Sequence, residues 1–152
     1  MTAVAERLVL RLSLLALEAI EEVARHIAGE IDRMVGSLRE AGLEINIETL
    51  GTPRRLSATT DQAAYRILQE ALTNAARHGA GSARITLTFE AEALKLTVTN
   101  PLSPGRAPSA LEGHGLIGMR ERATLVGGTF DARASSGVFR IHVRFPDRGH
   151  GT

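Results

Sequence analysis

The chain has 152 residues, which is enough for one domain with a buried core. Apolar residues make up 43% of the chain and the formal net charge is +1, so we expect neither disorder nor a global field that recruits nucleic acid. Cysteine is absent, which excludes a disulfide scaffold, thiol catalysis and cysteine-ligated zinc, and the simplest expectation is a cytoplasmic protein.

The first predicted element is a long amphipathic helix over residues 3–40, which Gly42 ends. Apolar residues recur every three or four positions on one of its faces: Ile20, Val23, Ile27, Ile31, Met34 and Leu38. The apolar run at residues 8–20 contains Arg11 and Glu18 and is too short to span a bilayer, so we expect no membrane segment in this chain. The helix packs in the core, or it provides a docking or homodimer surface.

The remaining elements follow from alternation, helical spacing and turn residues. They are a strand at 43–50, a helix at 59–78 capped by Gly79, a hairpin at 83–90 and 93–99, a loop at 101–112, a helix at 116–126, and a strand pair at 129–134 and 138–145. Because strands come in adjacent pairs, we expect a mixed, mostly antiparallel sheet covered on one face by helices. The predicted fold class is an α+β two-layer sandwich with an extra N-terminal helix.

Residues 113–128 read GHGLIGMRERATLVGG and begin with the spelling G-x-G-x-x-G. A dinucleotide fold needs a strand that leads directly into the glycines, whereas a proline-rich loop precedes them here. Lys95 is the only lysine and lies upstream, which argues against a protein-kinase loop and excludes a G-x-x-x-x-G-K phosphate loop. Gly113 and Gly115 let the backbone approach an anion at the N-terminus of the helix near Leu116. A tight loop that merely enters a helix is the alternative.

The helix at 59–78 carries a second group of candidates. Glu70, Asn74, Arg77 and His78 share its polar side, for which a solvated face is the ordinary interpretation. Asparagine is a poor helix-interior residue, and a carboxylate and a carboxamide one turn apart suit Mg²⁺ together with phosphates. Arg77 and His78 meet phosphate, or they only complement the C-terminal end of the helix.

These two stretches carry a resemblance to a known family. QEALTNAARHG (69–79) resembles the N-box of the ATP-binding domain of sensor histidine kinases. Residues 113–128 resemble the G2 box and following helix of the branch paired with helix-turn-helix (NarL/LuxR-type) response regulators. The resemblance covers residues 31–146 and implies the Bergerat (GHKL) fold shared with gyrase and the Hsp90 chaperones. It implies a kinase that binds Mg-ATP and donates the γ-phosphoryl group to a histidine on an acceptor helix, and through it to a response regulator.

The resemblance also implies roles for single residues. Asn74 would hold Mg²⁺, and Glu70 would position water or the metal. The other nucleotide-binding positions of the two boxes would be Arg77, His78, Gly113, Gly115 and Leu116. Residues 101–112 would form an ATP lid that is mobile when empty. Gly118 is expected to serve helix packing, and His114 has no role.

The chain departs from the family in two places. The family's D-x-G-x-G box reads NPLSPG here, at residues 100–105. Asn100 replaces the aspartate and accepts the adenine hydrogen bond without charge assistance, and Gly105 stands in for a glycine. No histidine with an acidic neighbour occurs in the first helix, because His26 lacks one. The acceptor is therefore expected elsewhere in a longer kinase or in a separate protein.

Two alternatives remain open at this stage. An anti-sigma-factor serine kinase shares this kind of N-box, and a degenerate, non-catalytic nucleotide-binding or dimerisation module would tolerate the altered box and the missing acceptor. In either case the expected organisation is a linker or docking helix at 1–30, the ATP-binding domain at 31–146, and a flexible tail at 147–152.

Overall fold

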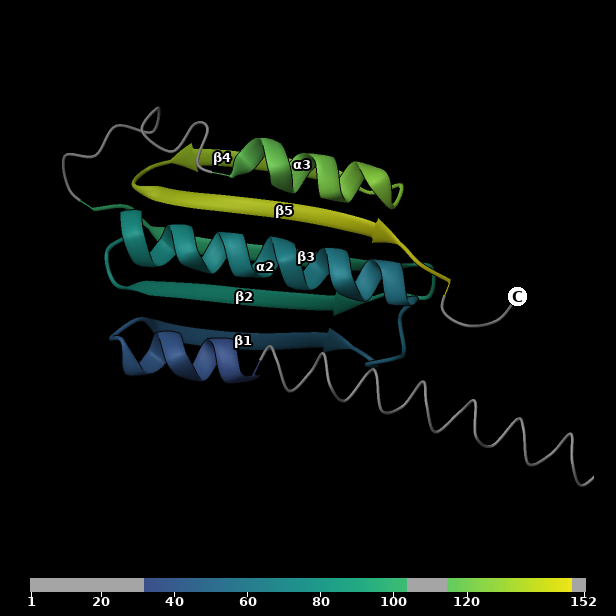
Figure 1. Cartoon of the computed structure of the whole chain (residues 1–152), viewed down its shortest axis with the longest axis horizontal. Coiled ribbons are helices and arrows are strands. Elements are labelled where there is room, and N and C mark those ends of the chain that lie inside the picture. Colours follow the sequence, from purple (N-terminus) through teal and green to yellow (C-terminus); the bar gives the residue numbers. More distant parts are fainter. Residues whose placement is uncertain (1–31, 104–114, 149–152) are drawn as a thin grey trace, which may run out of the picture.

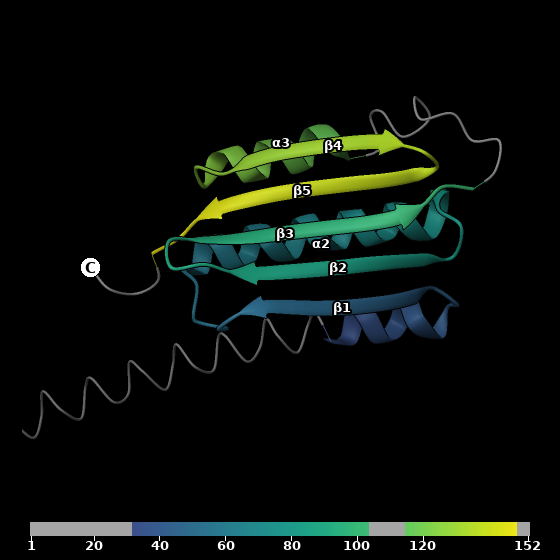
Figure 2. The same ribbon diagram turned by 180° about the vertical axis from the view of Figure 1, so that it is seen from behind.

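A computed structural model describes residues 32–103 and 115–148 of the chain, which form one sheet and its covering helices (Figure 1). Helical residues 32–40 precede β1 (Glu44–Gly51), α2 (Ala58–His78), β2 (Ser82–Phe89), β3 (Ala93–Pro101), α3 (Leu116–Leu125), β4 (Thr129–Ser135) and β5 (Val138–Pro146). Seen from the other side, the strands lie in front of α2 and α3 (Figure 2). The predicted α+β sandwich with helices on one face is confirmed.

The sheet is mixed and mostly antiparallel, as predicted. Its strand order is β1-β2-β3-β5-β4, in which only the β1–β2 pair is parallel. That pair needs a long crossover, and α2 supplies it. The β4–β5 hairpin turns through Ser136 and Gly137, whose φ angles of 52° and 77° match a tight two-residue turn.

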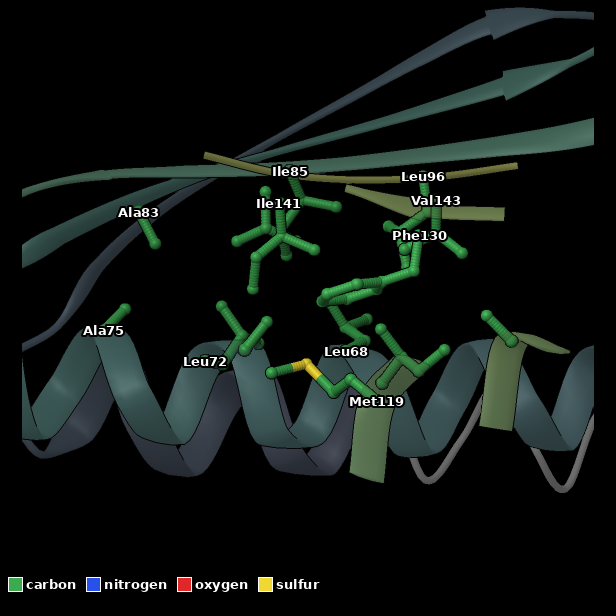
Figure 3. Close-up of a cluster of buried hydrophobic side chains, with 14 of the residues drawn as sticks. Leu68, Leu72, Ala75, Ala83, Ile85, Leu96, Met119, Phe130, Ile141 and Val143 are labelled. Carbon is green, nitrogen blue, oxygen red and sulfur yellow. The ribbon is translucent and has the colours of Figure 1, made fainter. Parts of the chain in front are cut away.

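The hydrophobic core lies between the sheet and the helices (Figure 3). Along β3 the side chains of Leu94, Leu96 and Val98 are buried because a strand alternates its side chains between two faces. These β3 residues pack against the apolar side of α2 and against Met119 of α3. Other buried members of the core include Ile67, Leu68 and Leu72 of α2 and Ile85, Ile141, Val143 and Phe145 of the sheet. The other face of the sheet is polar.

The N-terminal segment is described only in part. The predicted helix 3–40 is confirmed over residues 32–40, and Gly42, with φ 104°, follows its end. The predicted linker at 1–30, with His26, lies outside the described residues. Within those residues, no helix has the length and apolar character needed to cross a membrane.

Asp147 follows β5 and is held in place instead of starting a loose tail. It is 6% exposed, and its Oδ2 accepts hydrogen bonds from Ser57 N (3.0 Å) and Ser57 Oγ (2.9 Å). Arg54 donates to its Oδ1 at 3.4 Å and to its carbonyl oxygen. Ser57 is the N-cap of α2, so Asp147 fastens the start of that helix to the end of the sheet. The predicted flexible tail therefore does not begin at Asp147, and residues 149–152 lie outside the described part.

We expect Asp147→Ala to lower the free energy of unfolding by about 2 kcal/mol, because it removes the carboxylate that accepts from Ser57 N and Oγ and that pairs with Arg54 in a largely buried site, while Arg54 keeps its backbone acceptors. Urea denaturation followed by circular dichroism measures the change. Asp131→Ala is the matched control. Asp131 forms an ion pair with Arg133 at 2.9 Å, and the side chains of Arg133 and Asp131 are 79% and 55% exposed. It should cost less than about 0.5 kcal/mol. Equal effects of the two substitutions would contradict the anchoring role of Asp147.

Candidate functional site

The polar side of α2 is not uniformly solvated. Asn74 is only 7% exposed, Glu70 and His78 are half-buried, and Arg77 is exposed. The interpretation of this side of α2 as a solvated face therefore holds for Arg77 but not for Asn74. Burying a carboxamide is unfavourable unless its polar atoms are used, so a buried asparagine in mid-helix marks a place where a polar contact is made.

Glu70 of α2 lies against the start of α3. Gly115 is the N-cap of α3 and has the left-handed φ of 77°. A Cβ atom placed on it would lie 2.8 Å from Glu70 Oε2, so only glycine fits there without displacing the carboxylate. Among the described residues no side chain caps α3, and the first turn of this helix contains no acidic residue. The exposed N–H groups and the positive end of the helix dipole suit an anion at this point.

Asn100 lies at the other end of the same region. It is 4% exposed and shares the helix-facing side of β3 with Leu96 and Val98. Its Nδ2 donates to the Pro101 carbonyl oxygen at 3.2 Å, and a Cβ atom on Gly79 would lie 2.9 Å from that nitrogen. Its Oδ1 makes no hydrogen bond among the described residues, so this oxygen is available to accept one from an amino group.

The contacts of Gly79 were not foreseen from the sequence. Gly79 caps α2 as predicted, but with φ −90° and ψ −176° in place of the left-handed conformation typical of such caps. Glycine is required here by close approach, since a Cβ atom would lie 2.5 Å from the Ala75 carbonyl oxygen. Leu102 pairs with Gly79 in an isolated bridge, and Ser103 Oγ donates to its carbonyl oxygen at 2.8 Å. The predicted loop therefore begins two residues later, and no local pattern marks Ser103 because this contact spans 24 residues.

The candidate residues are spread along α2, which packs beside α3 (Figure 1). Glu70 with Gly115 lies near one end of the region, and Gly79 with Asn100 lies at the other. The helix rises about 1.5 Å per residue, so Glu70 and Gly79 are separated by about 14 Å, with Asn74 between them. The site therefore suits an extended ligand that is anionic at one end and carries a hydrogen-bond donor at the other.

The oxygen donors of this region fit a magnesium ion. Among the residues the structure describes, no group of three or more His, Asp or Glu side chains could hold a metal by itself. Mg²⁺ needs only one or two protein oxygens when phosphates and water complete its shell. Asn74 and Glu70 offer a carboxamide and a carboxylate oxygen of this kind, one turn apart.

Four other predicted positions have different outcomes. Gly105 and Gly113, with residues 104–112 of the predicted lid, lie outside the described residues and stay predictions. Leu116 is half-buried and packs against the core, so only its backbone can face a ligand. The packing role predicted for Gly118 is wrong within the described part of the chain, because a Cβ atom there would meet no described residue within 4 Å.

Comparison with known proteins places the chain among ATPases. The family model described as histidine kinase-, DNA gyrase B-, and HSP90-like ATPase matches residues 59–149. The sensor histidine kinase YxjM of Bacillus subtilis is 33% identical, over 93% of this chain and 38% of that protein. The signal transduction histidine-protein kinase/phosphatase UhpB of Salmonella typhimurium is 26% identical, over 86% of this chain and 31% of that protein. The chain thus spans about a third of the length of these relatives.

Solved structures share the fold. Full-length ShkA in complex with AMPPNP superimposes with a TM-score of 0.60 at 21% identity, over 88% of this chain and 31% of that chain. The nucleotide-free catalytic domain of the histidine kinase ThkA superimposes with a TM-score of 0.54 at 19% identity, over 86% of this chain and 91% of that chain. At these identities the two structures establish the architecture alone.

Proposed function

Because the chain belongs to the family of histidine kinase-, DNA gyrase B-, and HSP90-like ATPases, we propose that it is the ATP-binding catalytic domain of a two-component sensor histidine kinase. The matched residues 59–149 include every candidate side chain from Glu70 to Leu116. The curated relatives YxjM and UhpB are named as histidine kinases, which favours this function over an anti-sigma-factor serine kinase. The branch paired with helix-turn-helix response regulators, a cytoplasmic location and dimerisation through residues 1–30 belong to the same proposal.

The observation that carries the proposal is the contact between Glu70 and Gly115 at the uncapped start of α3. ATP would place its phosphates there, against the backbone of Gly115 and Leu116. Asn100 Oδ1 would accept a hydrogen bond from the adenine amino group at the other end. ShkA, which shares this fold, was solved in complex with AMPPNP, and this supports nucleotide binding by the fold.

Asn74 and Glu70 would hold Mg²⁺, which when bound offsets the negative charge of the phosphates. The chain's own residues position the nucleotide: the amides of α3 hold the phosphates, and Arg77 and His78 add positive charge and hydrogen-bond donors. An imidazole nitrogen of the acceptor then attacks the γ-phosphorus in line. A nitrogen–phosphorus bond forms, the bond to the bridging oxygen breaks, and ADP leaves. The base that takes the imidazole proton belongs to the acceptor helix.

Phosphotransfer in trans tests this function. The chain would be incubated with Mg²⁺, γ-labelled ATP and a helical hairpin that bears the acceptor histidine of a sensor histidine kinase. We expect label on the hairpin that is lost in acid and survives in base, and none on a hairpin whose histidine is replaced by alanine. Acid-stable label on a supplied protein substrate of an anti-sigma-factor serine kinase would instead support that alternative. ATP binding without transfer to either target would support the non-catalytic module.

A further inference from the structure

The face of the sheet opposite the helices is cationic and is not covered by any described residue (Figure 2). Its side chains alternate with the buried ones along each strand. On the three central strands β2, β3 and β5 this face presents four cations and no carboxylate: Arg84, Lys95, Arg140 and Arg144. The acidic residues on the strands of this face, Glu44, Glu48 and Asp131, lie on the edge strands β1 and β4, and Glu90 directly follows the end of β2.

The strand register sets like charges directly against each other on this face. Lys95 pairs with Arg144, and Arg140 pairs with Arg133. Like charges at directly opposed positions are destabilising. Arg133 and Lys95 are each compensated by an ion pair, with Asp131 (2.9 Å) and Glu90 (3.0 Å). Arg84, Arg140 and Arg144 have no such pair within the described residues.

The half-buried His142 responds to this positive charge. Its Nδ1 lies 2.8 Å from Thr97 Oγ1 in the middle of the face. Burial lowers the pKa of His142, and the positive charges of Arg140 and Lys95 lower it further, while Asp131 raises it. Two positive charges and one negative charge thus act on the centre of the face, an arrangement that favours an anion there.

A hollow of about 210 Å³ lies on this face beside the end of β3. Its lining includes Asn46, Ser82, Arg84, Thr99, Pro101 and Val138. The register explains the hollow, because the short Thr99 side chain lies directly between the long side chains of Arg84 on β2 and Arg140 on β5. Its lining residues, which also include Ala83 and Asn100, comprise two with hydroxyls, two with carboxamides and one with a guanidinium group, and none with a carboxylate.

We propose that this hollow is a second anion site, separate from the nucleotide site, and that it binds a phosphate group. Arg84 lines the hollow, whereas Arg140 stands outside its lining, two strand spacings from Arg84 (about 10 Å) across Thr99. The charge of Arg140 therefore adds to the attraction of an anion that Arg84 binds directly. Guanidinium groups bind phosphate in a bidentate manner, and the Ser82 and Thr99 hydroxyls add donors. Water occupies about 30 Å³ per molecule in the liquid, so a hollow of about 210 Å³ has room for a phosphate group, as in a phosphate monoester or a lipid headgroup.

The two sites lie on opposite faces of β3. The Asn100 side chain lies on the buried, helix-facing side of β3, although Asn100 also borders the hollow between Thr99 and Pro101. Phosphate is also expected at the start of α3 if the proposed function is correct, so the test must tell the two positions apart. Backbone amide resonances do so, because the hollow and the start of α3 share no residue.

The experiment is a titration of the ¹⁵N-labelled chain with inorganic phosphate, at constant ionic strength and with Mg-ADP present. We expect saturable shifts at Ser82, Arg84 and Thr99. Arg84→Gln should weaken this binding at least about tenfold, and Arg140→Gln should also weaken it. Arg122→Gln is the control, since it removes the same charge from an exposed position on α3 and should leave the affinity unchanged.

Two further arms identify the source of the phosphate. If glycerol 3-phosphate shifts the same amide resonances, the result supports a soluble phosphate monoester as the ligand. Binding to vesicles of phosphatidylglycerol but not of phosphatidylcholine, lost in Arg84→Gln, supports a lipid headgroup. The proposal is overturned if phosphate shifts no amide of the hollow, or if Arg84→Gln and Arg122→Gln weaken binding equally. Shifts confined to residues 115–118 would also overturn it, and they would leave the proposed nucleotide site standing.

Discussion

Replacing Asn74 with alanine is expected to abolish measurable Mg-ATP binding, with a loss of affinity of at least about 100-fold, or about 2.7 kcal/mol. The substitution removes the buried carboxamide oxygen that we assign to the metal and leaves Glu70 to hold it alone. Asn74→Asp keeps an oxygen but buries a negative charge one turn from Glu70, so it should also abolish binding. Isothermal titration calorimetry with Mg²⁺, and again with EDTA, measures both variants.

Gln62→Ala is the matched control for Asn74, because it removes an exposed carboxamide from the same helix. It should bind Mg-ATP as the parent chain does. Thermal unfolding by circular dichroism shows whether each variant is folded. Unchanged affinity in a folded Asn74→Ala variant would remove the metal assignment. An equal loss with Mg²⁺ and with EDTA would mean that Asn74 contacts the nucleotide and not the ion.

Gly115→Ala should weaken nucleotide binding by about the same factor as Asn74→Ala, for a steric reason. The new Cβ atom would lie 2.8 Å from Glu70 Oε2, at a residue whose φ of 77° is unfavourable for any side chain. The Glu70 carboxylate must then swing away from the start of α3, and the strained backbone of residue 115 shifts the amides assigned to the phosphates. We also expect a loss of about 1–2 kcal/mol in the free energy of unfolding.

Gly118→Ala provides the control within the same helix. Its Cβ atom would meet nothing within 4 Å, and Gly118 has no positive φ. Alanine stabilises a helix interior by about 0.5–1 kcal/mol relative to glycine, so this variant should be at least as stable as the parent chain and bind nucleotide equally well. Titration with a fluorescent ATP analogue compares the two. Similar affinities for Gly115→Ala and Gly118→Ala would refute the close contact with Glu70 as a requirement for binding.

Local patterns in the sequence were sufficient to predict the elements and the fold class. A period of two along β3 and a period near 3.6 along α2 reflect which face of each element is buried, and both are visible within a few residues. The hairpin at Ser136 and Gly137 and the helix end at Gly42 are local for the same reason. Glu70, Asn74 and Gly115 could be named because each lies in a short motif that resembles a known family.

Only the tertiary structure decided which of these residues meet. The sequence placed Asn74 on a polar side of α2, but its burial depends on what packs against that side. Glu70 lies against Gly115 because α3 packs beside α2, and Asp147 reaches Ser57 because the end of β5 lies beside the start of α2.

The cationic hollow depends in the same way on strand register. Register sets Thr99 between Arg84 and Arg140, and no stretch of sequence encodes it locally. Periodicity determines which face a side chain takes within its own element. Contacts between elements arise only when the elements pack, so they had to come from the folded structure.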